Sequence, residues 1–219
     1  MAFAVALIGA CSTSPGPKRS DASYLPLKKG IYQVYDVDSA WYTVNGMQEE
    51  HYELLTEVVD SFPNTEGGYT YVIYRYKRPD AGSEWSYHDT WSARVSGHRV
   101  IVSEASTAFV KFTLPVIEGA VWNGNAFNDL GVDDYEMLRV GIPYTVDGTT
   151  FDDCAEVSQN DDDDMIVRTD IRKEVYARDV GLIRREIRIL NYCTAGCNVF
   201  GEIESGVEYT QTIKEYGVR

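Results

Sequence analysis

Residues 165–190 read MIVRTDIRKEVYARDVGLIRREIRIL, and this stretch decides the fold class. In its first part apolar side chains such as Ile171 and Val175 stand at odd positions, and charged side chains fill the even ones. In its second part Ile187 and Ile189 alternate with arginine and glutamate. A period of two is typical of antiparallel strands with one buried and one wet face. The stretch therefore predicts two strands whose apolar positions face the core and whose charged positions face solvent.

Turn signals divide the rest of the chain into short segments of the same kind. Asn45-Gly46 and Asp147-Gly148 predict two-residue hairpins, because type I′ turns need a positive φ at both central positions. Glycine-containing reversals follow at 66–68, 80–82 and 96–97. We expect an all-β fold of about ten antiparallel strands, a single meander sheet curved strongly into a barrel or a sandwich.

Three segments need separate interpretation. Residues 49–60 (EEHYELLTEVVD) resemble a helix in composition, but their alternation favours a strand. Residues 69–78 (YTYVIYRYKR) carry large side chains on both faces, which predicts a central strand or one that lines a cavity. Residues 122–131 are rich in Asn and Gly and predict an irregular or short helical insertion. We expect one β-domain over residues 24–219.

The amino-acid composition and net charge limit the classes of partner that the protein is expected to bind. The chain has 219 residues, 44% of them hydrophobic, so it can build a packed core. Its 34 acidic and 20 basic side chains give a net charge of −14. Such a surface repels phosphate backbones, so nucleic acid is not an expected partner.

The start of the chain predicts an anchor. Residues 1–10 (MAFAVALIGA) are too few to span a bilayer but suit the apolar region of an export signal. Ile8 to Cys11 resembles the lipobox of bacterial lipoproteins, in which the cysteine after the cleavage site carries the lipid. Residues 11–23 then predict a flexible, lipid-attached tether. The competing interpretation is a buried N-terminal strand with an ordinary core cysteine. We expect acylated Cys11 to hold the domain on a membrane of the cell envelope, with the outer membrane favoured.

Several motifs occur in an order that resembles a known family. They are 24–30 (YLPLKKG), 32–39 (YQVYDVDS), 76–80 (YKRPD), 122–125 (WNGN), 127–128 (FN), 174–177 (EVYA), 180–182 (VGL) and 205–210 (SGVEYT). In these motifs the chain resembles uncharacterised lipoproteins of Bacteroidetes-type bacteria. The resemblance implies an envelope β-protein and no assigned activity, substrate or cofactor. The extra cysteine pair in 193–197 (CTAGC) departs from the pattern.

The cysteines after Cys11 are odd in number. In an oxidising envelope Cys193 and Cys197 could form a disulfide, which would leave Cys154 buried and inert. Alternatively, Cys154 pairs with one of the two. A lone C-x₃-C pair is a weak zinc signal, because zinc usually takes four ligands.

The most suggestive cluster is 84–91 (EWSYHDTW). On a regular strand Trp85, Tyr87, Asp89 and Trp91 share one face. If it is exposed, this face is a stacking platform for sugars or an apolar ligand. If it is buried, it is simply core, which is the commoner outcome.

No catalytic motif stands out. His51, His88 and His98 are widely separated and favour ordinary hydrogen-bonded roles. The run 161–164 (DDDD) lacks the spacing and the glycine of a calcium loop and favours a solvated hairpin tip. We expect neither metal nor cofactor.

Three functions remain open. The first is a non-catalytic envelope lipoprotein that binds an apolar small molecule or a partner protein, and it predicts an open apolar cavity. The second is an envelope hydrolase, which predicts two facing carboxyl groups, one with a raised pKa. The third is a purely structural or interaction module with an exposed apolar patch.

Overall fold

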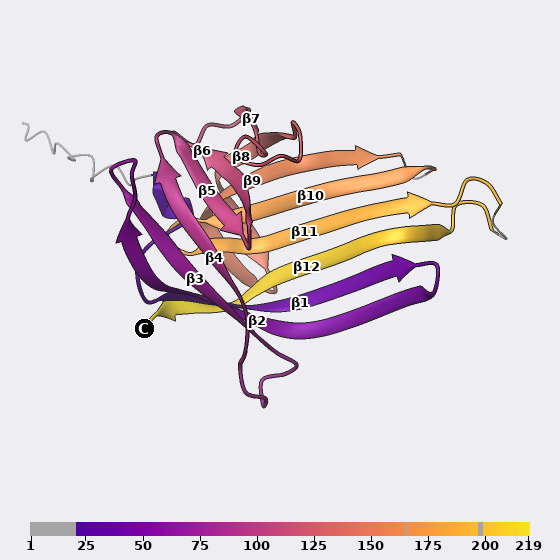
Figure 1. Ribbon diagram of the computed structural model, residues 1–219, viewed down its shortest axis with the longest axis horizontal. Coiled ribbons are helices and arrows are strands. Elements are labelled where there is room, and N and C mark those ends of the chain that lie inside the picture. The colour runs from indigo at the N-terminus through magenta and orange to yellow at the C-terminus, as the bar shows by residue number, and fades with distance from the viewer. Residues whose placement is uncertain (1–20, 165, 197–198) are drawn as a thin grey trace, which may run out of the picture.

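The computed structural model describes residues 21–164, 166–196 and 199–219, and its strands form one antiparallel sheet (Figure 1). A 3-10 helix, η1 (Asp21–Tyr24), precedes them. The first six strands are β1 (Ile31–Thr43), β2 (Gly46–Pro63), β3 (Tyr69–Arg78), β4 (Ser86–Ser96), β5 (Arg99–Glu104) and β6 (Thr107–Thr113). The other six are β7 (Val121–Asn123), β8 (Asp134–Val146), β9 (Thr149–Asp163), β10 (Arg168–Ala177), β11 (Gly181–Tyr192) and β12 (Ile203–Val218).

The strand order confirms the predicted meander. It runs β6-β5-β4-β3-β2-β1-β12-β11-β10-β9-β8-β7, so every strand except β1 and β12 pairs only with its sequence neighbours. The pairing of β1 with β12 joins the two halves of the chain. Twelve strands replace the expected ten or so. Residues 49–60 lie in β2, as predicted, and the Asp147-Gly148 turn has the positive φ values of 44° and 80° that the dipeptide predicts.

The barrel closes where β6 meets β7, without a regular strand ladder. The backbone N–H of Val110 donates to the Gly124 carbonyl at 2.8 Å, and Trp122 Nε1 donates to the Val110 carbonyl at 2.8 Å. Asn128 Nδ2 reaches the Ala108 carbonyl at 2.8 Å. The segment 122–131 is therefore irregular, as expected, with a short strand followed by turns and no helix. Its indole and amide side chains seal the seam.

One end of the barrel is closed by the start of the described chain (Figure 1). Tyr24 is fully buried, its hydroxyl donates to Asp153, and the Arg178 guanidinium lies 4.3 Å from its ring centre. Residues 21–23, which the sequence assigns to the tether, thus belong to a helical turn packed on the sheet. Residues 1–20 lie outside the described ranges.

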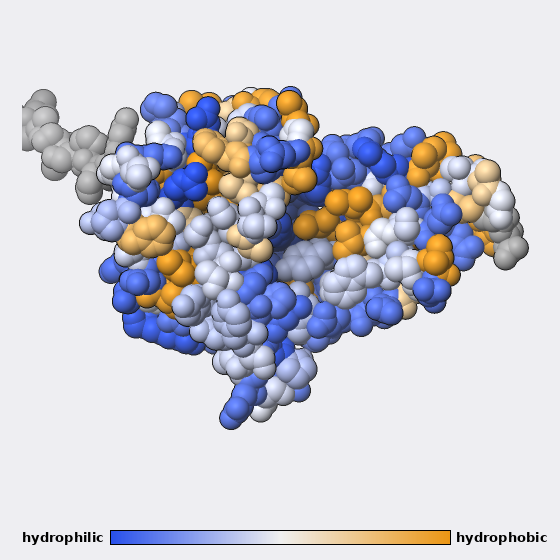
Figure 2. Space-filling model, in the orientation of Figure 1, coloured by the Kyte–Doolittle hydropathy of each residue, from blue (hydrophilic) through white to orange (hydrophobic). Residues whose placement is uncertain are grey.

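The other end is open. The long strands β9 to β12, β1 and β2 continue beyond β3 to β6 as a curved sheet, to the right in Figure 1. Figure 2 shows a hollow where the barrel passes into this sheet, with apolar surface on its floor. The chain therefore has a closed end near its first described residue and an open, concave end.

The two strands predicted from 165–190 are present as β10 and β11, but the charged even positions of β10 do not all face solvent. Arg172 pairs with Ile187 and faces the lumen with it. Glu174, assigned to solvent, is only 1% exposed and points into the barrel. A buried carboxylate is tolerated only when counter-charges and hydrogen bonds replace its water. The other wall of the barrel supplies them, which a pattern within one strand cannot reveal.

Candidate functional site in the barrel lumen

Four charged side chains meet inside the barrel, and we call them the ion layer: Glu104, Lys111, Glu174 and Arg185. Lys111 Nζ lies 2.6 Å from Glu104 Oε1 and 2.8 Å from Glu174 Oε1. Arg185 Nη2 lies 3.0 Å from Glu104 Oε2, and its Nε lies 3.3 Å from Glu174 Oε1. β5 and β6 supply one pair and β10 and β11 the other, so the layer bridges opposite walls.

Both the acidic and the basic members of the ion layer carry their charges. Burial alone would raise the pKa of Glu104, but the nearby charges of Arg185 and Lys111 outweigh it and lower the pKa to about 2. The same balance, with Lys111 first, lowers the pKa of Glu174. Both carboxylates are therefore ionised at neutral pH, and the two cations neutralise them.

On the closed side of this layer lies a cavity of about 80 Å³, here called the N-terminal cavity. Its walls are largely apolar and include Leu25, Leu27, Leu54, Ile73, Val102 and Leu182. Lys111, Glu174 and Arg185 also line it, so the ion layer forms its floor. Cavities of roughly 150 Å³ hold a benzene ring, so this one suits a smaller apolar group, such as the end of a chain.

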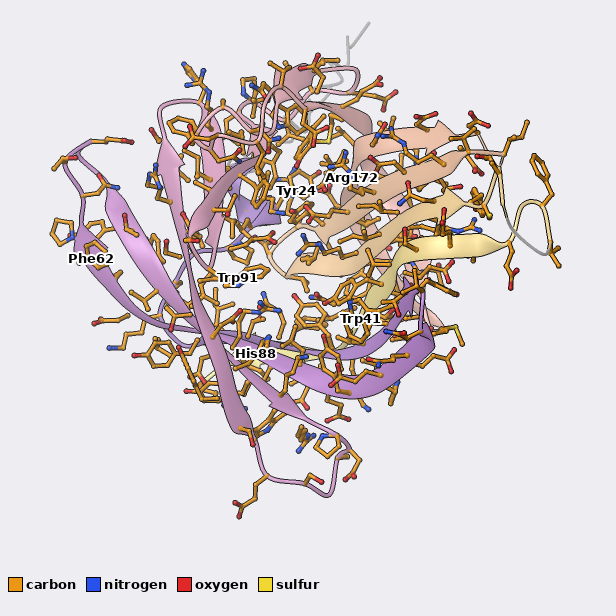
Figure 3. All side chains as sticks on the ribbon, turned by 45° about the vertical axis from the view of Figure 1, so that its right-hand side comes forward. Tyr24, Trp41, Phe62, His88, Trp91 and Arg172 are labelled. Carbon is orange, nitrogen blue, oxygen red and sulfur yellow. The ribbon has the colours of Figure 1, made fainter. Side chains whose placement is uncertain are left out.

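Trp91 is the member of the predicted aromatic cluster that lines this cavity (Figure 3). The Arg75 guanidinium lies 3.8 Å from its ring centre, and both Arg75 Nη1 and Trp91 Nε1 donate to Asp89 Oδ2. Arg75 is 7% exposed, and its Nε has no hydrogen-bond partner among the described residues. The indole is thus held in one orientation by the Arg75–Asp89 ion pair.

The rest of the aromatic cluster is not on this face. The register between β3 and β4 shifts at His88, between the pairs Tyr76–Tyr87 and Arg75–Asp89. Such a bulge reverses the alternation. Tyr87 is 61% exposed and packs against Tyr74 and Tyr76 on the outer face.

Trp85 lies before β4, and the Arg78 guanidinium is 4.2 Å from its ring centre. The prediction that Trp85, Tyr87 and Trp91 share a face is therefore wrong. A single extra residue in the strand separates Tyr87 from Trp91.

Of the carboxyl groups that the structure describes, none has the raised pKa that the hydrolase alternative predicts. Among the described residues, the pKa departs from its usual range for three carboxyl groups, Glu53, Glu104 and Glu174, and is lowered in each. Glu104 and Glu174 share a lysine across the lumen, but a general acid needs a raised pKa. His51 pairs with Asp38 on the surface, at 2.7 Å.

The structure tests part of the predicted cysteine pairing. Cys154 is a free, buried thiol, which excludes its pairing with either of the other two cysteines. Cys193 is disulfide-bonded. Cys197 and Cys11 lie outside the described residues, so a Cys193–Cys197 bond and lipidation stay predictions.

In the acidic run, Asp161 pairs with Lys173 and Asp162 with Arg168. Within the described ranges no set of three His, Cys, Asp or Glu side chains could hold a metal ion. Helices long and apolar enough to cross a membrane are likewise missing from the described part of the chain.

Sequence reasoning missed the ion layer and Arg75. A local signal did exist for Lys111, which stands between Val110 and Phe112 in an otherwise apolar strand. A lone lysine in such a place is buried only when it is paired. Its partners come from β5 and β10, 7 and 63 positions away, and no spacing rule connects them.

The chain resembles two solved structures. No protein-family model matches the sequence, and neither does any curated protein. Among solved structures, the chain resembles a proposed lipoprotein from Parabacteroides distasonis at 12% identity and a TM-score of 0.50, over 89% of this chain and 98% of that one. It also resembles a proposed exported protein with a YmcC-like fold from Bacteroides fragilis, at 12% identity and a TM-score of 0.48, over 88% and 98%. At this identity the likeness to the Parabacteroides chain concerns the fold alone.

Proposed function

We propose that this protein is a lipoprotein of the bacterial cell envelope that binds a small apolar group in the N-terminal cavity. The observation that carries the proposal is this cavity itself, with apolar walls, a charge-neutral floor and the fixed indole of Trp91. Most ligand sites combine apolar walls with a few fixed polar groups. The volume of about 80 Å³ limits the occupant to a chain end or a group of similar size.

The anchor is supported by the order of features at the start of the chain. An apolar leader, residues 8–11 (IGAC) and a Pro/Gly/Ser-rich stretch come directly before η1. The Parabacteroides chain that shares the fold is itself described as a proposed lipoprotein. In this proposal acylated Cys11 holds the barrel on the outer membrane, with its closed end nearest the lipid.

Labelling of cells with a radioactive fatty acid tests the anchor. Wild-type protein should incorporate label, and a Cys11→Ala variant should incorporate none. Equal label in both proteins defeats the lipoprotein proposal but leaves the cavity proposal standing.

Methyl NMR of the full chain with Cys11→Ser tests the cavity. Propane, an apolar molecule smaller than benzene, should shift the methyl signals of Ile73, Val102 and Leu182, which line it. Ile73→Phe should fill the space and abolish the shifts, whereas Ile73→Ala should enlarge it and strengthen binding. Val72→Phe, a change of the same kind at the neighbouring position outside the cavity lining, is the matched control. Unchanged spectra in wild type and Ile73→Ala would refute the proposal.

A separate observation supports a second candidate function, the binding of a partner protein. Exposed apolar side chains gather at neighbouring hairpin tips of the open end: Val44, Ile166, Val167, Val199 and Phe200. A photo-crosslinking residue at position 200 should capture an envelope protein in cells if these tips contact one, and the same residue at Asp147, at another hairpin turn, should not. Equal yields at both positions would contradict this role.

A further inference from the structure

A second recess lies on the open side of the ion layer, with a volume of about 150 Å³. It shares Lys111 and Arg185 with the N-terminal cavity, so the same two cations face both spaces. Its polar lining consists of hydrogen-bond donors, and we call it the donor recess: Lys111, Tyr135, Gln159, Arg172 and Arg185. Burial raises the pKa of Tyr135, which keeps its hydroxyl protonated. No carboxylate is among the described residues that line it.

Gln159 gives the recess its clearest sign of a missing partner. It is only 5% exposed, yet its Nε2 has no hydrogen-bond partner in the described part of the chain. It also sits at a register shift, because Asn160 pairs with Arg172 and Ser158 with Lys173. A bulge of this kind re-aims a side chain, and bulges are frequent beside functional sites. A buried amide without an acceptor is costly, so the recess favours a ligand that supplies an oxygen.

The charges around the recess select against an ionic head group. Lys111 and Arg185 are neutralised by the two glutamates of the ion layer, and Arg172 pairs with Asp133 and Asp170. Three positive charges therefore face four negative ones, a local sum of −1. With the chain's net charge of −14, this sum repels an anion. A cation finds no carboxylate on the described lining, so an uncharged acceptor fits best.

An apolar track leads away from the donors. Phe109, Ile187 and Ile189 line the recess itself. In the register of the open sheet, Ile189 lies beside Val207 of β12, and Val207 lies beside Trp41 of β1. Cross-strand partners share a face, and three strands span about 10 Å. Trp41 is 39% exposed at the end of this track, and Figures 2 and 3 show the apolar floor and the position of Trp41 on the open sheet.

We propose that the donor recess binds the head of an uncharged single-chain amphiphile whose ester or hydroxyl oxygens accept from Gln159, while its hydrocarbon chain lies on the Ile189–Trp41 track. Acylglycerols and alkyl glycosides both have this chemistry. The site is separate from the N-terminal cavity and does not rest on the proposed function.

Isothermal titration calorimetry on the full chain with Cys11→Ser tests this site. Three ten-carbon probes, each below its critical micelle concentration, differ only in the head: decanoylglycerol, decanoate and decyltrimethylammonium. Decanoylglycerol should bind most tightly. Decyl glucoside, a fourth probe, has hydroxyl groups but no ester and so distinguishes recognition of the ester from recognition of a hydroxyl. The site is supported if decanoylglycerol or decyl glucoside binds more tightly than both ionic probes.

Gln159→Met keeps the side-chain size and removes the donors. It should weaken decanoylglycerol binding roughly three- to tenfold, the equivalent of about one hydrogen bond, without lowering the urea midpoint of the free protein. Gln33→Met, the same change on the closed side of the ion layer, and Ile73→Phe should leave the affinity unchanged. Three results would each overturn the proposal. The ionic probes could bind as tightly as the neutral ones, the Gln159→Met variant could bind decanoylglycerol as tightly as wild type, or neither neutral probe could give any heat of binding.

Discussion

The closed and open sides of the ion layer share strands and two cations, but they differ in what surrounds them. On the closed side η1 and residues 25–27 cover the lumen, and the cavity walls are mostly apolar. On the open side the covering strands end, and donors line a recess that continues onto a concave sheet. The four charged side chains of the ion layer thus divide one barrel into two chemically different spaces.

The largest expected effect comes from breaking the layer itself. Lys111→Met leaves two buried glutamates with one cation, and removal of one partner of a buried pair costs about 3–5 kcal/mol. Urea unfolding should show this loss. The control, Arg168→Met, removes an ion pair whose side chains are 50% and 54% exposed and should cost under about 1 kcal/mol. Similar losses in the two variants would mean that the layer does not divide the lumen as a buried unit.

The layer should also respond to acid. The pKa of Glu104 is about 2 in the folded protein and about 4.5 when unfolded, so its contribution is complete above pH 4.5 and is lost as the pH falls towards 2. At pH 6 the Glu104→Gln variant should be less stable than wild type by roughly 3–4 kcal/mol. Unfolding curves from pH 6 to pH 2.5 should show this gap narrow. A gap that is constant over this range contradicts the assignment.

The open side can be disturbed through Gly124, next to the seam. A Cβ at this position would lie 2.3 Å from the ring of Tyr135, a buried wall of the donor recess. Gly124→Ala should therefore destabilise the protein by about 1–3 kcal/mol. Gly68→Ala, where the added atom meets only ordinary contacts, is the control for the urea midpoint. If both variants unfold alike, the ring is not packed against the seam.

The smallest effect concerns Cys154. Burial raises the pKa of its thiol to about 11, so it should resist thiol reagents in native protein at pH 7.5. In the Cys11→Ser chain, non-reducing urea should expose one reactive thiol if Cys193 and Cys197 are paired. Three reactive thiols would contradict that pairing, and rapid labelling of native protein would contradict the burial of Cys154.

The sequence predicts the fold well because its signals are local. Alternation in 165–190 and the Asp147-Gly148 turn each depend on neighbouring residues, and both elements are present. The faces were harder to predict, because Glu174 is buried by partners on β6 and β11. The prediction of a shared face for the aromatic cluster was wrong because of one residue, His88. A bulge at this position cannot be recognised from the alternation of side chains in the sequence. Contacts across the lumen, rather than patterns along a strand, determine the candidate sites.

The most direct test is a crystal of the Cys11→Ser chain under xenon pressure. Xenon enters apolar cavities that water leaves empty. We expect one anomalous peak in the N-terminal cavity, between Ile73, Trp91 and Val102, and no such peak in the Ile73→Phe variant. Absence of xenon from this cavity, or an equal peak in the filled variant, would contradict an apolar site on the closed side of the ion layer.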